Sequence, residues 1–265
     1  MKKLATFLIL IFLILVTIHF LLSPKSDEFK VDDLYDTIQA RGKIKVGLNP
    51  ETKPFCFKNE KGEYVGYDVD LARFIAEYIF KDKNKFEVIE VTHSNRLLKA
   101  STGEADIVIS TITITPQREE IVTFSIPYDN AGQAILVKSS SRITSMSDLN
   151  GLNVGVVFGT TAEKNMKNLL PSANLLGFKS YNEAYMALKE GKIDAITSDD
   201  VILNRFAIKD SSVKLLPKKY SKEPYGIAFK KGTSTNKLKE HLDILINDLQ
   251  QKNIILKLRR TWGIE

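Results

Sequence analysis

The chain has 265 residues, of which 43% are apolar and 26% are charged, so its composition is that of a globular protein and excludes collagen-like and wholly disordered chains. A single cysteine excludes an intrachain disulfide framework, and at roughly 100 to 200 residues per domain the length fits one large domain or two modest lobes. Half of the net charge of +6 comes from the three lysines of residues 1–26, where no acid occurs, and the rest is too weakly basic to indicate a nucleic-acid partner.

The N-terminal segment predicts export. Lys2 and Lys3 precede an almost uninterrupted apolar run over residues 4–22, which at about 1.5 Å per residue nearly spans a hydrocarbon core of roughly 30 Å. Because no small-residue cleavage site follows and Pro24 lies at the polar exit, we expect residues 1–26 to be an uncleaved membrane anchor, with a removed signal peptide as the alternative. Lysines before the run and acids after it place the remaining chain outside the cytoplasm, anchored to the outer face of the cytoplasmic membrane or secreted.

Strand-like and helix-like segments alternate from Lys43 onward, after a polar and acidic stretch over 27–42 that we expect to be a short tether. The run ADIVIS is continuously apolar, which is typical of a parallel strand covered on both faces, and the alternation indicates βαβ units. We expect Asp68 to cap the first long helix and Cys56 to be a small buried hydrophobic residue. The segments expected in chain order are strands at 43–48, 86–91, 105–110, 134–138, 153–157, 193–198 and 225–232, with helices that start near residues 68, 94, 161, 182 and 200 and a last one over 238–249.

The segment TITITPQREE at 111–120 is the strongest candidate for a binding motif. Thr115 is placed to cap a short helix with Pro116 at its first position, which puts Arg118 in the first turn. A cation there opposes the helix dipole, at a cost of roughly 0.3 to 1 kcal/mol. Either the two glutamates that follow compensate the charge and Arg118 is solvated, or Arg118 turns toward the strand end, where its guanidinium can hold a carboxylate in a bidentate pair.

Two further strand ends carry polar residues, and ligands of open α/β sheets bind at such ends. In GTTAEK, Thr160 and Glu163 fit a capping box, and the N–H groups of this helix start can hold an anion, although many helices begin this way without a ligand. In ITSDD, we expect Asp200 to cap the next helix, which leaves Asp199 as a carboxylate that can face an ammonium group.

The segment THSNR at 92–96 follows the strand FEVIEV. Taken alone, Arg96 is expected to be a surface arginine and His93 an ordinary polar loop side chain. The other two histidines lie in the apolar N-terminal run and on the final helix, so no three-histidine metal cluster is expected. Neither a G-x-S-x-G motif nor a P-loop occurs, and we expect neither a metal nor a cofactor.

Several segments, taken as a set, resemble the polar amino-acid solute-binding proteins of bacterial ABC importers. They are GYDVDLARFIAE, GEADIVISTITITPQREEIVTFSIPY, DLNGLNVGVVFGTTAE, IDAITSDD, EPYGIAFKKG and a terminal Trp-Gly, in order over about residues 43–263. The resemblance implies an α/β fold of the two-lobed, periplasmic-binding-protein-like (type II) kind, with two crossover strands and the ligand in the interlobe cleft. It implies a first lobe over 27–135 and 225–265, and a second over 136–224.

The resemblance also implies roles by position. Arg118 would bind the α-carboxylate of an amino acid. The backbone N–H of Thr113 and the helix start at Thr160 and Thr161 would help to hold that group.

Asp199, with the Thr113 hydroxyl and the Thr111 carbonyl, would take the α-ammonium group. The S-N-R segment at 94–96 resembles the subgroup that binds glutamate or aspartate, in which Arg96 would pair with the side-chain carboxylate. Two arginines and one acid then balance the two negative groups and one positive group of such a ligand. Where many relatives place an aromatic ring over the ligand, this chain has Thr52.

We therefore expect the extracytoplasmic binding protein of an amino-acid ABC importer, which closes its lobes over glutamate or aspartate. Its partners would be the free amino acid, the permease subunits and, through the N-terminal segment, the membrane, and the protein would be a monomer. One alternative is a binder of glutamine or asparagine. The others are a cyclohexadienyl-dehydratase-like enzyme, with Glu223 as the nominated general acid or base, and an extracellular ligand sensor on the same fold.

Overall fold

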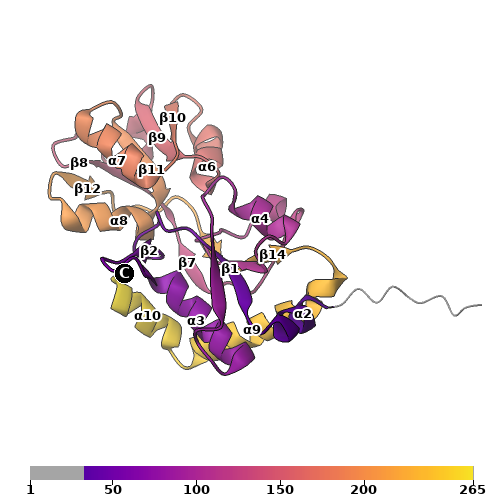
Figure 1. Cartoon of the computed structure of the whole chain (residues 1–265). Helices are drawn as coiled ribbons and strands as arrows, with labels where there is room; N and C mark the ends of the chain where they lie inside the picture. The colour runs from indigo at the N-terminus through magenta and orange to yellow at the C-terminus, as the bar shows by residue number, and fades with distance from the viewer. Residues whose placement is uncertain (1–32, 265) are drawn as a thin grey trace, which may run out of the picture. The chain divides into compact units, whose positions relative to one another are not determined.

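Two five-stranded mixed sheets organise residues 33–264, the part of the chain that this computed structural model describes (Figure 1). The first sheet has the strand order β4-β1-β5-β14-β6 and defines lobe 1, and the second has the order β10-β9-β11-β8-β12 and defines lobe 2. In each sheet the first three strands are parallel, and the fourth runs antiparallel to both of its neighbours. The predicted two-lobed α/β fold is confirmed.

The helices and strands have the following bounds. Lobe 1 contains α2 (Leu34–Arg41), β1 (Ile44–Leu48), β2 (Phe57–Lys58), β3 (Tyr64–Val65), α3 (Tyr67–Phe80), β4 (Phe86–Glu90), α4 (Arg96–Thr102), β5 (Ile107–Val108), α5 (Pro116–Glu119), β6 (Val122–Phe124), β14 (Ala228–Lys230), α9 (Asn236–Gln251) and α10 (Ile254–Trp262). Lobe 2 contains β8 (Gln133–Lys138), β9 (Asn153–Val157), α6 (Thr161–Leu169), β10 (Asn174–Phe178), α7 (Tyr181–Glu190), β11 (Ala195–Asp199), α8 (Asp200–Lys209) and β12 (Val213–Leu215). The connecting strands are β7 (Asp129–Ala131) and β13 (Glu223–Tyr225), and short 3₁₀ turns occur at Met146–Leu149 and Thr233–Thr235.

The lobes are joined by β7 and β13, which pair antiparallel with each other and belong to neither large sheet. Two extended segments side by side can twist without breaking either core, so this ribbon suits a hinge. The predicted lobe boundaries at 135/136 and 224/225 fall within β8 and β13, and they remain predictions.

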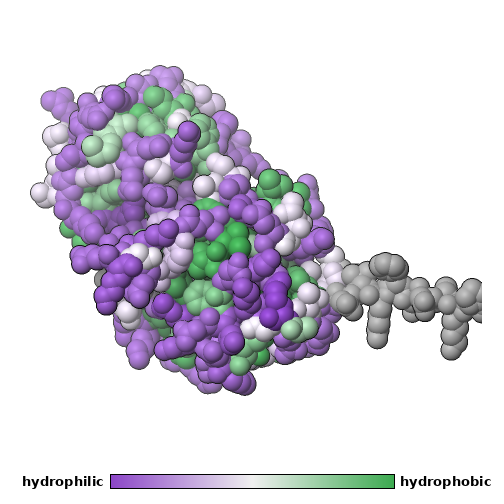
Figure 2. All heavy atoms as spheres, in the orientation of Figure 1, coloured by the Kyte–Doolittle hydropathy of each residue, from purple (hydrophilic) through white to green (hydrophobic). Residues whose placement is uncertain are grey.

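Helices cover both sheets with apolar faces. In lobe 1, α3 packs on β1, while α9 contacts α2, α3 and α10; in lobe 2, α7 and α8 pack on the sheet (Figure 1). The described residues contain no helix whose length and hydropathy would suffice to cross a bilayer, and the apolar run at 4–22 lies outside them. Hydrophilic side chains cover most of the face seen in Figure 2, with smaller apolar patches on both lobes.

The second half of the expected tether is a helix, which corrects that prediction. Helix α2 begins after Asp33, whose carboxylate accepts a hydrogen bond from the backbone N–H of Tyr35 at 2.8 Å. Tyr35 and Ile38 are buried against the rest of lobe 1, and the ring of Tyr35 stacks on His241 of α9 at a centroid distance of 4.0 Å. Packing on α9 therefore stabilises a helix that polar composition did not indicate.

Of the helix N-caps predicted in lobe 1, one is confirmed and one is wrong. Thr115 caps α5, because its hydroxyl oxygen accepts from the Arg118 N–H at 3.3 Å, and Pro116 follows as expected. The cap predicted at Asp68 is wrong: Gly66 occupies that position with a φ of +134°, and a Cβ there would lie 2.2 Å from the Phe55 carbonyl oxygen. Asp68 is instead buried within the first turn, where desolvation raises its pKa to about 8. Cys56 is buried, as predicted.

Candidate functional site

The lobes contact each other at the carbonyl group of Gly159, which follows β9 of lobe 2. This oxygen accepts hydrogen bonds from Nη2 of Arg118 at 3.1 Å and from Nη2 of Arg96 at 3.4 Å, both in lobe 1. Gly159 has a φ of +78°, and a Cβ would lie 2.4 Å from the backbone oxygen of His93. Only glycine permits this approach, because it has no Cβ and adopts positive φ without strain.

Arg118 is held at the cleft by the cap of its own short helix. Its side chain is buried, and Nη1 donates to the Thr113 carbonyl at 2.8 Å. Burial lowers the pKa of Arg118 to about 10, with the nearby Arg96 as the second cause. The solvated alternative is therefore wrong, and Arg118 turns toward the strand end.

Arg96 begins α4 and is also buried, so the expectation of a surface arginine is wrong. It is only 2% exposed, and Nη1 donates to the carbonyl groups of Ser110 and Thr111, the latter at 3.3 Å. Desolvation by burial lowers the pKa of Arg96. Its Nε is buried and has no hydrogen-bond partner among the described residues.

The segment that follows β5 presents its backbone carbonyl groups to these arginines. Thr111 has a φ of +46°, a strained value for a β-branched residue, and its carbonyl turns toward Arg96. The hydroxyl groups of Ser110 and Thr111 are buried and have no partner among the described residues. Thr113 is buried and forms an isolated antiparallel bridge with Tyr225 of β13, which ties this segment to the hinge.

Asp199 ends β11 on the lobe 2 side, and its carboxylate accepts a hydrogen bond from the Tyr225 hydroxyl. Burial raises the pKa of Asp199 to about 7, with Glu223 as the second cause. The cap predicted at Asp200 is wrong, because its carboxylate accepts from the Gly132 N–H at 2.9 Å and pairs with Lys219. Asp199 occupies the cap position but makes no capping bond, and its carboxylate is directed to Tyr225 of β13 instead.

The start of α6 differs from the predicted capping box. The hydroxyl of Thr160 donates to the Val157 carbonyl at 2.7 Å instead of accepting from the helix, and Glu163 pairs with Lys167 at 2.8 Å. The hydroxyl of Thr161 donates to Oε2 of Glu223 at 2.8 Å. Both side chains are thus turned to protein acceptors, and what this helix start offers a ligand is its backbone N–H groups.

Glu223 is a buried carboxylate surrounded by neutral donors. It accepts from the hydroxyl groups of Ser221 at 2.5 Å and Thr161 at 2.8 Å, and from the Asn165 amide at 3.1 Å. These bonds fasten β13 to α6, which makes Glu223 a hinge residue.

His93 and Tyr181 belong to the cleft, although neither was predicted to lie there. His93 is 4% exposed, its Nε2 lies 3.2 Å from Oγ1 of Thr52, and its ring meets Tyr181 of lobe 2 edge to face at 5.1 Å. Burial and the charges of Arg96 and Arg118 keep the pKa of His93 well below its ordinary value, so the imidazole is neutral. Its Nδ1 has no partner among the described residues, and the expectation of an ordinary loop side chain is wrong.

The fold thus brings the predicted site residues together where the two lobes meet. These residues are Arg96, Thr111, Thr113 and Arg118 from lobe 1, and Thr160, Thr161 and Asp199 from lobe 2. Across residues 33–264 no group of three or more His, Cys, Asp or Glu side chains is arranged to hold a metal ion.

Comparisons with known proteins agree with this architecture. Residues 44–265 match the model of the bacterial extracellular solute-binding proteins, family 3. A glutamine-binding protein of Geobacillus stearothermophilus is 41% identical over 75% of this chain and 76% of its own length, and the glutamine-binding protein of an ABC transporter of Bacillus subtilis is 40% identical over 79% and 77%. The crystal structure of a cysteine-binding protein from Campylobacter jejuni superposes with a TM-score of 0.82 at 30% identity, over 87% of this chain and 92% of that one.

These relatives correct the expected substrate. Glutamate or aspartate was inferred from Arg96, yet the two relatives at 40% and 41% identity are glutamine-binding proteins. The physical reason for the error is that a guanidinium N–H can donate to an amide oxygen as well as to a carboxylate oxygen. An arginine at this position therefore does not by itself select an acidic ligand.

Proposed function

Because the chain belongs to the bacterial extracellular solute-binding proteins of family 3, we propose that it is the binding component of an amino-acid ABC importer whose ligand is glutamine or a similar neutral amide. The description of the family as extracellular supports a place outside the cytoplasm, and the two glutamine-binding relatives support binding as the function. The protein would deliver its ligand to permease subunits as a monomer that residues 1–26 anchor to the membrane.

The α-amino and α-carboxylate groups of the ligand would meet the two buried charges of opposite sign. Arg118 would hold the carboxylate in a bidentate pair, supported by the N–H of Thr113 and by the backbone N–H groups at Thr160 and Thr161 of α6. Asp199 would accept from the ammonium group, together with the Thr111 carbonyl and the Thr113 hydroxyl. Since Arg118 and Asp199 come from different lobes, a bound amino acid favours the closed arrangement.

The proposal of an amide ligand is supported by two buried nitrogen atoms that have no hydrogen-bond partner among the described residues, Nε of Arg96 and Nδ1 of His93. Nε of Arg96 is a donor. If Nε2–H of His93 donates to Thr52, then Nδ1 of the neutral ring is an acceptor. One donor and one acceptor match the C=O and NH₂ of a side-chain amide. A carboxylate has acceptors only, so one of its oxygens would face the lone pair of Nδ1.

A thermal-shift screen across the twenty amino acids, followed by calorimetry, tests this proposal. We expect glutamine to stabilise the protein most, and glutamate to bind roughly 10- to 100-fold more weakly because one buried acceptor would be left unmatched. A His93→Phe variant, which removes the acceptor and keeps a ring, should narrow the ratio between the two ligands. Equal affinities of the unmodified protein for glutamine and glutamate would overturn the amide assignment, and stabilisation by no amino acid would overturn the function.

A further inference from the structure

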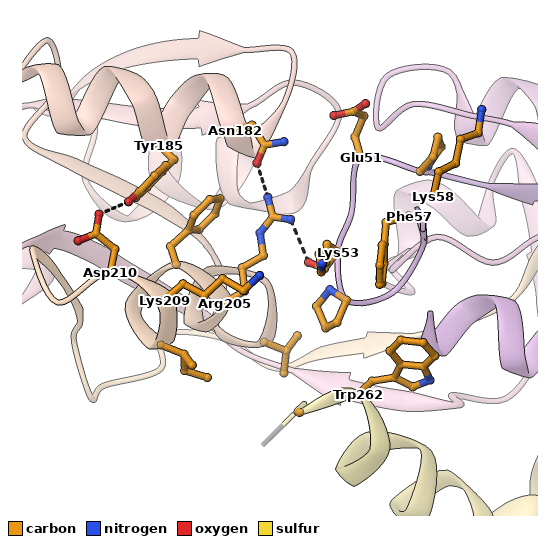
Figure 3. Close-up of a pocket in the computed structure, with 16 residues that line it drawn as sticks. Glu51, Lys53, Phe57, Lys58, Asn182, Tyr185, Arg205, Lys209, Asp210 and Trp262 are labelled. Carbon is orange, nitrogen blue, oxygen red and sulfur yellow. Dashed lines mark hydrogen bonds between the residues drawn. The ribbon is translucent and has the colours of Figure 1, made fainter. Parts of the chain in front are cut away.

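A cavity lies at the junction of the lobes, beside the proposed amino-acid site (Figure 3). It has a volume of about 770 Å³ and is lined by both lobes. The chain at 50–54 separates the two sites, because Thr52 is buried against His93 whereas Glu51 and Lys53 line this cavity. We call this cavity the junction groove.

Two cations of the junction groove are supported by aromatic rings, one from each lobe. Nζ of Lys53 lies 4.1 Å from the ring centroid of Phe57, and Cζ of Arg205 lies 4.3 Å from that of Phe206. Arg205 also reaches across the junction, donating to the Lys53 carbonyl at 3.2 Å and to the Asn182 side-chain oxygen at 2.8 Å (Figure 3). All of these partners are neutral, so they position the cations without cancelling their charge.

Other charged side chains around the groove are already paired. Lys58 forms a salt bridge with Glu90 at 2.8 Å, and Asp210 forms one with Lys189 at 2.6 Å. These pairs contribute little net charge to the groove. The charges that remain are those of Lys53, Arg205, Lys209 and Glu51.

The remaining groups leave the junction groove with an excess of positive charge. Lys53, Arg205 and Lys209 line it and form no salt bridge within residues 33–264, and Glu51 is the one acid left to oppose them. Burial lowers the pKa of Lys53, and the charges of Lys209 and Arg205 add to this effect. Nε of Arg205 is buried without a partner among the described residues. Like charges brought together from two lobes repel, and this repulsion opposes lobe contact.

We propose that the junction groove binds a small multivalent oxyanion, either phosphate or a polycarboxylate, and that the bound anion holds the two lobes together. An oxyanion can accept from Lys53 of lobe 1 and from Arg205 and Lys209 of lobe 2 at once. It would replace the repulsion between these groups by attraction, and it would make that full set of contacts only when the lobes meet. The anion and the amino acid would then each strengthen binding of the other.

Calorimetry on the unmodified protein, with inorganic phosphate and with citrate as probes against chloride at matched ionic strength, tests the proposal. We expect saturable binding of one anion per chain, and the probe that binds identifies the source as inorganic or carboxylic. Lys53→Gln and Lys209→Gln should each weaken this binding about tenfold. The control Lys192→Gln removes the same charge from an exposed lysine outside the groove, and it should bind the anion like the unmodified protein.

Binding of neither probe, or equal binding by the two groove variants and the unmodified protein, would overturn the site. With the anion saturating, the affinity for the amino acid should rise by about fivefold; an unchanged affinity would overturn the coupling between the lobes. The anion titration needs no amino acid, so it stands apart from the test of the glutamine proposal.

Discussion

Replacing Arg118 by alanine should abolish measurable binding of glutamine by calorimetry. In the proposed complex the ligand carboxylate lies in a closed cleft, and removing its partner leaves a buried charge unpaired. Such a loss costs about 2 to 5 kcal/mol, equivalent to roughly 30-fold to several thousand-fold in affinity. Arg118 also donates to Thr113 and Gly159, so the variant loses an interlobe contact as well.

The matched control is Arg142→Ala, which removes the same side chain from an exposed position of lobe 2. It should bind glutamine like the unmodified protein. Both variants should keep the melting temperature of the ligand-free protein within a few degrees, since Arg142 is exposed and the loss of the Arg118 hydrogen bonds is offset by removing a charge that burial disfavours. An Arg118→Ala protein that folds and retains affinity within threefold would refute the role of Arg118.

Replacing Asp199 by asparagine should cause the second large loss, again about 2 to 5 kcal/mol of binding free energy, because the ligand ammonium would face no anion. Asparagine has nearly the same shape and keeps an oxygen that can accept from the Tyr225 hydroxyl, so the fold should persist. Asp194→Asn is the matched control, since that acid lies exposed just before the same strand. Calorimetry with glutamine on the unmodified protein, Asp199→Asn and Asp194→Asn measures this loss. If Asp199→Asn binds glutamine as tightly as the control does, Asp199 is not the partner of the ammonium group.

The raised pKa of Asp199 also predicts a pH dependence of glutamine binding. With a pKa of about 7, Asp199 is mostly protonated in the ligand-free protein below neutral pH. An ammonium group nearby favours the charged form, so binding releases a proton there, and affinity should rise from pH 5 to about 7 and then level off. The ligand-free protein should show the opposite trend, because a folded pKa above the ordinary value near 4 makes unfolding easier as pH rises from about 4 to 7. Both trends should weaken in Asp199→Asn.

Local signals in the sequence were sufficient for β1, β4, β5, β8, β9 and β11, but they did not indicate the mostly short strands β2, β3, β6, β7, β10 and β12. The continuous apolar run before Thr111 and the Thr-Pro pair at 115 and 116 fix a strand and a capped turn within a few residues, so the position of Arg118 follows from its neighbours. The two-lobed arrangement came from the resemblance of several segments, each of which is weak alone.

What the sequence did not reveal depends on distant partners. His93 is buried because Tyr181 of lobe 2 and Thr52 cover it, and neither lies near it in the chain. Helix α2 is stable because α9, some two hundred residues later, covers Tyr35. The substrate was misassigned for a different reason: Arg96 was recognised as a donor, but the proposed contribution of His93 depends on its burial beside Thr52, which the sequence does not reveal.

The absence of a side chain at Gly159 determines how closely the two lobes can approach each other. The Gly159 carbonyl accepts from the guanidinium groups of Arg96 and Arg118, and even a methyl group at Gly159 would collide with the backbone of His93. Any larger residue would therefore hold the two lobes apart. The distance to which the two lobes can approach each other thus depends on one hydrogen atom, the side chain of Gly159.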